Sequence, residues 1–476
     1  MSAPQNEIND GSSSRILASL EAFWKRMRPA QLFVGSFVLL IVVGTIGFLF
    51  LPGLYTGEGL GLIDALFTAT SAVCVTGLIV VDTATYFTTV GQVWILLLIQ
   101  LGGLGMITLA SIIITALNQR LSLRSHALAT GVELLGARIS AGELVRRVVL
   151  FTFLIEGIGA FLLWIWWGIG NGDWGSIWPA VFHSISAFCN AGFSTWSDSL
   201  MGLQRDPVSL AIVMWLIVLG GIGFVVMSDL DQWWKSRHLP QSHRISLHSR
   251  VTLVATLILI VGGWFLFALF EWNVTLEGLP ALDRLANSLF MSVTSRTAGF
   301  NSIDYGAASD SSNFLTILLM SVGGSPGSTA GGLKTTTFAV ITIIAWSRFR
   351  GMTATSVAGR TLPESTVQGA VGFFTLGFAL ITMGIFAFIT LETPYISHRV
   401  AQGTFLPHMF EAVSAFNTVG LSMGITGGLD TTGKWITIIL MFIGRVGPLT
   451  LLAAIAARSH RSISKIRYAS EDVMVG

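Results

Sequence analysis

Four short strips that end in glycine recur along the 476-residue sequence. They read CVTG (74–77), CNAG (189–192), RTAG (296–299) and NTVG (417–420). Because the strips share little beyond the glycine, their common chemistry must belong to the backbone. A glycine with φ > 0 can turn carbonyl groups to one side without a Cβ penalty, and a ring of carbonyl oxygens can replace the water around a dehydrated cation. The candidate filter residues are Val75, Thr76, Gly77, Asn190, Ala191, Gly192, Thr297, Ala298, Gly299, Thr418, Val419 and Gly420.

A second glycine motif follows each strip at nearly constant spacing. The motifs are LGGLG (101–105), LGGIG (219–223), VGGSPG (322–327) and IGRVG (443–447). Two landmarks that recur in phase four times indicate an internal repeat. The competing interpretation is that the strip glycines only permit close helix packing, and four copies in register argue against it.

The composition places these strips in a membrane protein. Hydrophobic residues make up 52% of the chain and charged residues 11%, against ~25% charged in a soluble domain, and the mean hydropathy is +0.73. Two cysteines provide no disulfide framework. Apolar runs long enough to cross a bilayer occur near 31–51, 91–117, 148–169, 208–228, 251–270, 313–346, 370–391 and 434–456.

Each strip follows a short, half-polar segment that is too short to cross the membrane. These segments, expected to be re-entrant half-helices, read LIDALFTAT, IWPAVFHSI, LDRLANSLF and LPHMFEAV. The sequence therefore predicts an all-α polytopic membrane protein with four pseudo-symmetric helix–pore loop–helix repeats around one central pore. Its eight spanning helices would belong to repeats 1 (31–119), 2 (148–230), 3 (251–347) and 4 (370–457), between an N-terminal segment (1–30) and a C-terminal tail (458–476).

Basic residues cluster at the helix ends away from the strips. By the positive-inside rule, both termini and these connections are predicted to be cytoplasmic, and the strips open outward. Acidic residues near the strips would form a cation-collecting mouth: Glu58, Asp82, Asp173, Asp198, Asp206, Asp304, Asp310 and Asp430.

A gate is predicted beneath the strips. Arg445 lies in an apolar span, where a charge costs at least ~2.5 kcal/mol, and it occupies the slot of Gly103, Gly221 and Gly324 in the other repeats. We expect it to point at the axis as a fixed positive charge; the alternative is pairing with Glu156 or with the carboxyl end of a half-helix. The break GGSPGSTAGGLKTTT (323–337) would cross the same level. The candidate gate residues are Gly323, Gly324, Ser325, Gly327, Ser328, Thr329, Gly331, Gly332, Lys334 and Arg445.

Five other residues have expected roles outside the filter and the gate. Cys74 and Cys189 are interpreted as small fillers, and Arg296 is expected to face away from the pore and pin its loop to a carboxylate or carbonyl. Glu156 either holds a proton or sodium ion or, as we favour, pairs with a neighbouring helix. His183 is expected to hydrogen-bond to its own loop.

The sequence resembles the KtrB/TrkH family of bacterial potassium-uptake subunits over nearly its whole length. The matching motifs include DALFTATSAVCVTGLIVVDT (64–83), FHSISAFCNAGFSTWSD (182–198), SRTAGFNSID (295–304) and FEAVSAFNTVGLSMGIT (410–426). The short segment before the first span and the tail IRYASEDVMVG (466–476) favour the KtrB side. Pro326, inside the break, departs from the family pattern.

The resemblance implies a homodimer with one pore per protomer in the cytoplasmic membrane. It implies potassium as the transported ion, bound at the filter carbonyls, and sodium as an activator. No cofactor is expected in this chain; ATP or ADP would bind a cytoplasmic ring of RCK (KtrA-like) subunits that gates it. The alternatives are a secondary symporter that couples potassium to sodium or protons, and a sodium-selective channel. An enzyme is not expected, because no Ser/His/Asp group or metal-ligand cluster gathers on one side.

Overall fold

The computed structural model describes residues 29–116, 141–172, 176–238, 244–352, 354–392, 397, 403–448 and 450–452. The predicted C-terminal tail (458–476) and nearly all of the N-terminal segment (1–30) lie outside these residues.

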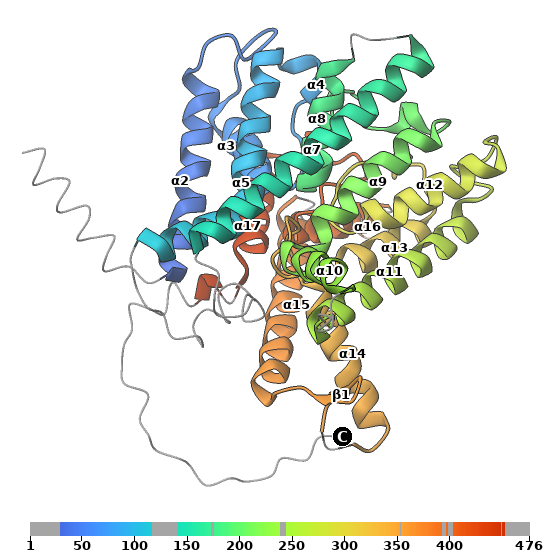
Figure 1. The fold of residues 1–476 in the computed structure, drawn as a ribbon. Coiled ribbons are helices and arrows are strands. Elements are labelled where there is room, and N and C mark those ends of the chain that lie inside the picture. The colour runs from blue at the N-terminus through green and yellow to red at the C-terminus, as the bar shows by residue number, and fades with distance from the viewer. Residues whose placement is uncertain are drawn as a thin grey trace, which may run out of the picture.

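The described helices fall into four successive groups, each of which begins with a long helix followed by a short one (Figure 1). The first group is α2 Pro29–Phe50, α3 Leu62–Val73, α4 Thr83–Tyr86 and α5 Thr89–Ala116. The second is α7 Ala141–Asn171, α8 Ile177–Cys189, α9 Pro207–Ile222 and α10 Phe224–Ser236, with the 3-10 turn η1 Met201–Leu203. The third is α11 Leu247–Glu271, α12 Ala281–Thr294, α13 Asp310–Met320 and α14 Thr335–Phe349. The fourth is α15 Glu364–Glu392, α16 Phe405–Asn417 and α17 Thr431–Val446, with the 3-10 turn η2 Thr426–Gly428. A small antiparallel hairpin, β1 Ser356–Val357 and β2 Arg360–Thr361, joins α14 to α15.

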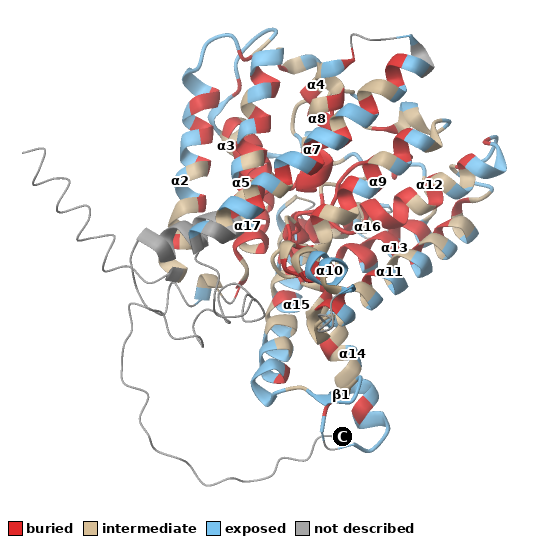
Figure 2. Cartoon of the chain, in the orientation of Figure 1, coloured by how far each residue is buried: buried red, intermediate tan, exposed pale blue. Residues whose placement is uncertain are grey.

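Four long helices satisfy the length and hydropathy needed to cross a membrane. They span Ala30–Phe50, Val145–Ile169, Leu247–Glu271 and Glu364–Glu392, which are the first helices of the four predicted repeats. Their outward faces are apolar yet exposed: Phe50 is 77% exposed and Phe386 70%, and pale blue marks such outer faces in Figure 2. Apolar side chains facing outward are stable in lipid rather than in water.

The short helices α3, α8, α12 and α16 form the interior. Most of their residues are buried, as the red segments of Figure 2 show. Each packs against a helix that follows the strip of the preceding group: α8 on α5, α12 on α9, α16 on α13 and α3 on α17. The last of these contacts joins the fourth group to the first. The four groups therefore close into a circle with the short helices inside.

Two predicted spans are not single helices. The run 208–228 breaks at Gly223, whose φ is +90°, and α10 is bent by 98° from α9. The amide of Phe224 bonds to the carbonyl oxygen of Gly327 instead of to a carbonyl of α9 (3.2 Å). The run 434–456 is likewise broken, because α17 ends before Gly447 (φ +86°).

The predicted break in the sixth span is present, with slightly different limits. Helix α13 ends at Met320 and α14 begins at Thr335. We call residues 321–334 the interrupted segment. Thr335 to Thr337, which were expected inside the break, form the first turn of α14.

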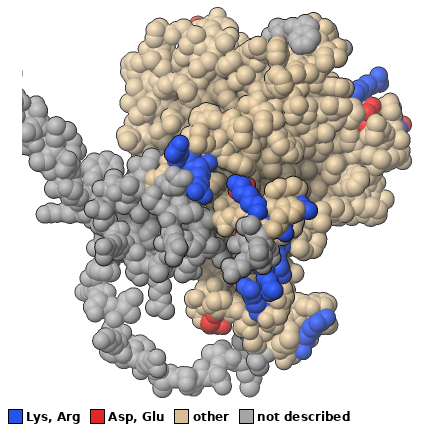
Figure 3. Space-filling view, in the orientation of Figure 1, with Lys and Arg blue, Asp and Glu red and all other residues tan. Residues whose placement is uncertain are grey.

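Exposed basic side chains gather at one end of the helices. In Figure 3 most of the Lys and Arg side chains on this face lie in its lower half, while the upper part is largely uncharged. Lys235 lies in the last turn of α10 and Arg348 in the last turn of α14. This asymmetry has the form that the positive-inside rule describes.

Candidate functional site

The four strip glycines form a closed ring. A Cβ added to Gly77 would lie 3.1 Å from the Cα of Gly192, and one added to Gly192 would lie 2.8 Å from the Cα of Gly299. A Cβ on Gly299 would lie 3.2 Å from the Cα of Gly420, and one on Gly420 would lie 3.1 Å from the Cα of Gly77. Each added Cβ would also collide with a carbonyl oxygen of a neighbouring strip. The ring therefore has room for backbone only, and its neighbours are backbone carbonyl groups.

The backbone two residues before each ring glycine is left-handed in all four strips. The φ angles are +56° at Val75, +58° at Asn190, +74° at Thr297 and +50° at Thr418. This conformation is unfavourable for β-branched residues, which occupy three of the four positions. It alternates with the positive φ of the glycines, between +70° and +95°. Strain of this kind persists only where surrounding contacts enforce it.

Hydroxyl groups behind the strips supply some of those contacts. Ser71 Oγ accepts a hydrogen bond from the amide of Gly77 (3.1 Å) and donates one to the carbonyl oxygen of Leu78 (2.7 Å). Ser186 and Thr294 donate in the same way to the carbonyl oxygens of Phe193 and Phe300. Ser414 Oγ accepts from the amide of Gly420 (3.1 Å). The sequence interpretation did not single out these residues, although a Ser-Ala pair precedes three of the strips.

The ends of the half-helices are held by the second glycine landmark. A Cβ on Gly102 would overlap the carbonyl oxygen of Val73, and Gly220 and Gly444 have the same relation to Phe188 and Phe416. The C-terminal ends of α3, α8 and α16 therefore pack directly on the landmark glycines. Each such end carries roughly −0.5 of a charge, which favours a cation nearby.

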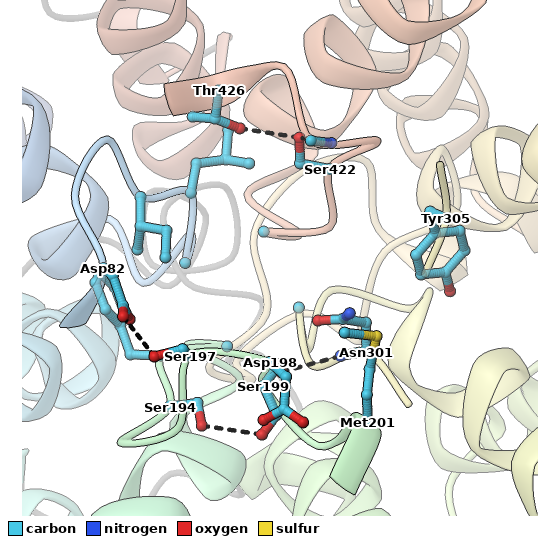
Figure 4. Close-up of a pocket in the computed structure, with 18 of the residues that line it drawn as sticks. Asp82, Ser194, Ser197, Asp198, Ser199, Met201, Asn301, Tyr305, Ser422 and Thr426 are labelled. Atoms are coloured by element: carbon cyan, nitrogen blue, oxygen red, sulfur yellow. Dashed lines mark hydrogen bonds between the residues drawn. The ribbon is translucent and has the colours of Figure 1, made fainter. Parts of the chain in front are cut away.

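A cavity of about 310 Å³ opens at the ring (Figure 4). All four ring glycines line it, together with Asp82, Asp198 and Asp304. Ser197 donates a hydrogen bond of 2.5 Å to Asp82 Oδ2, which joins the first group to the second. Partial burial raises the pKa of Asp82, but hydrogen bonds from Ser197, Thr85 and Ala84 outweigh it and hold the pKa below its usual range. Three acidic residues thus line the same cavity as the ring glycines.

The interrupted segment is hydrogen-bonded to the landmark glycines and to the second strip. Its amide groups bond to carbonyl oxygens of the glycine landmarks: Ser325 to Gly221 (3.0 Å), Thr329 to Gly220 (3.3 Å) and Gly332 to Gly444 (3.3 Å). Asn190 Nδ2, from the second strip, donates to Thr329 Oγ1 (3.1 Å). The segment is therefore bonded to strip and landmark residues of more than one group.

Arg445 contacts this segment directly. Its side chain is 2% exposed; Nη1 donates to the carbonyl oxygen of Thr329, and Nη2 donates to that of Gly102 at 3.1 Å. Lys334 Nζ donates to the carbonyl oxygen of Ala330 within the segment (2.7 Å). The structure thus brings together the residues predicted for the gate.

Comparisons with known proteins identify the family. The model for TrkH, described as a cation transport protein, matches residues 25–465. The chain belongs to the TrkH family. Within the TrkH family, it is 39% identical to the Ktr system potassium uptake protein B of Bacillus subtilis over 95% of this chain and 98% of that protein. It is 37% identical to the potassium/sodium uptake protein NtpJ of Enterococcus hirae, with the same coverage. Its fold matches that of TrkH from Vibrio parahaemolyticus with a TM-score of 0.70 at 18% identity, over 94% of this chain and 86% of that one.

Glu156, on the apolar helix α7 of this TrkH-family chain, has its partners on α5 and α8 and not on α17, which carries Arg445. Glu156 accepts a hydrogen bond from Gln100 Nε2 on α5 (3.0 Å). The thiol of Cys189 donates to Gln100 Oε1 (3.4 Å), so Cys189 is a hydrogen-bonded member of this cluster rather than only a filler. The expected pairing of Glu156 with a neighbouring helix is confirmed. The alternative Arg445–Glu156 pair is wrong, since the hydrogen-bond partners of Arg445 in the described part of the chain are backbone carbonyls.

Two buried titratable groups bond to the residues that follow the ring glycines. His183 Nε2 lies 2.9 Å from Ser194 Oγ, as expected from sequence. Glu411, which the sequence interpretation missed, occupies the equivalent position in the fourth group and accepts from Ser422 (2.8 Å) and Thr426 (2.6 Å). Its signal was the alignment of FHSISA with FEAVSA.

Part of the predicted acidic mouth has a different role. Asp206 caps α9 by accepting from the amide of Ser209, and Asp430 caps α17 by accepting from that of Gly433. These carboxylates compensate unpaired amides at helix starts. Among the described residues, no group of three or more His, Cys, Asp or Glu is placed to hold a metal ion.

Proposed function

We propose that this protein carries potassium across the cytoplasmic membrane through the glycine ring, as a channel-like translocating subunit. The observation that carries the proposal is the closed ring of Gly77, Gly192, Gly299 and Gly420 between an acidic cavity and the interrupted segment. Potassium would bind the carbonyl oxygens of the twelve filter residues, in four pseudo-symmetric repeats around one pore. The names of two relatives, potassium uptake protein B and potassium/sodium uptake protein, support the choice of ion.

Uptake of this kind needs no energy source within the chain. A membrane potential of 100 mV is worth ~2.3 kcal/mol per charge, and tenfold accumulation costs ~1.4 kcal/mol. Simple conduction therefore supports roughly 50-fold accumulation at 100 mV. The alternative is symport with sodium or protons by alternating access. A symporter usually has inverted repeats, whereas the four groups here follow each other in the same sense.

The gate is proposed to consist of the interrupted segment and Arg445. A fixed positive charge beneath the ring opposes cation entry, and the segment occupies the space below the half-helix ends. Displacement of the segment would remove both obstacles, because its Thr329 carbonyl is the group to which Arg445 donates.

Several features are proposed from the family alone. They are a homodimer, sodium activation, and control by a cytoplasmic RCK-type ring that binds ATP or ADP. The name "Ktr system" of one relative supports the existence of a partner subunit. Cytoplasmic termini accord with the basic residues at helix ends.

Expression in a cell that lacks its own potassium uptake tests the function. We expect growth at low external potassium and rubidium uptake, both increased by a co-expressed RCK subunit. Reconstituted into vesicles, the protein should give a current that reverses at the potassium equilibrium potential whatever the sodium or proton gradient. A reversal potential that moves with either gradient would establish the symporter instead, and one set by sodium alone would establish a sodium channel.

A further inference from the structure

Arg296 begins the third strip, but its side chain leaves the strip and reaches the interrupted segment. It is buried, and its Nη2 lies 3.1 Å from Thr335 Oγ1 and 3.4 Å from the carbonyl oxygen of Gly323. A third contact, at 3.5 Å, goes to Thr256 Oγ1 on α11. The equivalent slot of the other strips holds Cys74, Cys189 and Asn417. The third strip therefore has a connection that a cysteine in the same slot is too short to make.

The two groups that Arg296 reaches lie at the two ends of the interrupted segment, Gly323 inside it and Thr335 at the start of α14, where these ends bond to each other. The amide of Gly323 donates to the carbonyl oxygen of Leu333 (2.8 Å), and that of Thr335 donates to Gly324 (3.0 Å). Thr335 Oγ1 donates to the carbonyl oxygen of Gly323 (2.6 Å). We call these residues, 323–324 and 333–335, the neck. The neck is thus a closed, hydrogen-bonded unit with Arg296 at its side.

The fourth strip also holds the neck. Asn417 Oδ1 accepts a hydrogen bond from the amide of Leu333 (3.2 Å). Residues 325–332, which we call the tip, have other hydrogen-bond partners: Arg445 at Thr329, Asn190, and the landmark carbonyls. Two buried arginines therefore hold two different parts of one segment.

We propose that Arg296 is a positioning residue that fastens the neck to the third strip, so that opening moves the tip while the neck stays with the filter. A planar guanidinium can bond two acceptors in fixed geometry, and a buried cation is costly to leave unpaired. Both effects hold the neck in place. The same bonds transmit any displacement of the neck to Thr297, Ala298 and Gly299. This inference deepens the proposed function and rests on it where ion flux is concerned.

The test compares Arg296→Gln and Thr335→Val with Arg445→Ala in full-length reconstituted protein. Two quantities are measured: the potassium-to-sodium permeability ratio, and amide hydrogen exchange over residues 321–337. We expect the first two variants to lower the permeability ratio about tenfold and to speed exchange at the amides of Gly323 and Thr335. Arg445→Ala should raise flux and speed exchange in the tip, with an unchanged ratio. Thr335→Ser, which keeps the hydroxyl, should restore the neck, and Thr342→Val, which removes a hydroxyl bonded only within α14, is the matched control.

The proposal is overturned if folded Arg296→Gln protein keeps the wild-type permeability ratio and neck exchange, or if it raises flux with an unchanged ratio as Arg445→Ala does. If Arg296→Gln does not fold, Thr335→Val decides by the same two measurements. Should the wild-type protein conduct no potassium, the proposed function fails, while amide exchange still decides whether Arg296 fastens the neck.

Discussion

The guanidinium of Arg445 donates a hydrogen bond to the carbonyl oxygen of Thr329, and so joins the fourth group to the tip of the interrupted segment. A charged hydrogen bond of this kind is worth about 1.5–3 kcal/mol. If this bond holds the proposed gate closed, its loss should shift the balance between the closed and open forms by about 10- to 100-fold.

Replacement of Arg445 tests this link. We expect Arg445→Ala to raise potassium flux by about tenfold or more, because it removes both the bond to the tip and the charge below the ring. Arg445→Lys keeps the positive charge but loses the pair of hydrogen bonds to Thr329 and Gly102. Its flux should therefore lie between that of the wild type and that of Arg445→Ala. Flux is measured as rubidium uptake normalised to the amount of protein in the membrane. Wild-type flux in both variants would refute the gate.

The ring glycines should not tolerate any side chain. Gly77→Ala places a Cβ against Ala191 and Gly192 at a φ of +93°, where an L-residue pays roughly 1–2 kcal/mol. We expect the potassium-to-sodium permeability ratio to fall at least tenfold, with the same outcome for Gly192, Gly299 and Gly420. Gly262→Ala is the control, since a Cβ there meets nothing within 4 Å. An unchanged ratio in two or more ring variants would remove the ring from the conduction path.

The hydroxyls behind the strips should contribute to both stability and selectivity. Ser71→Ala removes the hydroxyl that bonds to the buried amide of Gly77 and to the carbonyl oxygen of Leu78. The loss should lower the free energy of unfolding by about 1–3 kcal/mol. We expect a lower melting temperature in detergent and a lower permeability ratio. Ser36→Ala, which removes a hydroxyl bonded within its own helix, should leave both near the wild-type values. Equal effects of the two substitutions would mean that Ser71 has no special role.

The ring itself was predictable because only glycine satisfies its geometry, and four copies of that requirement remain visible in the sequence. The left-handed residues two positions earlier were not predictable. Val75, Thr297 and Thr418 disfavour that conformation, and the surrounding hydrogen bonds impose it. The break at Gly223 was hidden for a related reason. After this break, the amide of Phe224 bonds to the carbonyl oxygen of Gly327, about a hundred residues away. No local sequence pattern reveals such a distant partner.

The half-helices were predictable from local sequence, whereas the partners of Arg296 were predictable only in part. Length and composition predict α3, α8, α12 and α16, since each lies between two apolar runs. The expectation that Arg296 pins its loop to a carbonyl is confirmed by its contact with Gly323. That this carbonyl belongs to the neck depends on how the third group folds, which the sequence pattern does not specify.

The outer cavity should respond to acid through Asp82. Its pKa is held below the usual range, so the ionised form favours the folded state. Its contribution to stability is present above the unfolded pKa of about 3.9 and is lost as the pH falls through the folded value. The difference in melting temperature between wild type and Asp82→Asn should therefore be constant at neutral pH and shrink below about pH 4. A melting-temperature difference that grows in acid would show that the pKa of Asp82 is not lowered in the folded protein.

The breaks beneath the ring have a consequence for solvation. The carbonyl oxygens of Gly220, Gly221 and Gly444 receive hydrogen bonds from the interrupted segment, and withdrawal of the segment leaves them bare in a narrow passage. Water is the hydrogen-bond donor available to replace these bonds, while a passing cation is the other group that carbonyl oxygens bind. The passage must therefore wet as it opens, and osmotic stress that withdraws water should hold it shut.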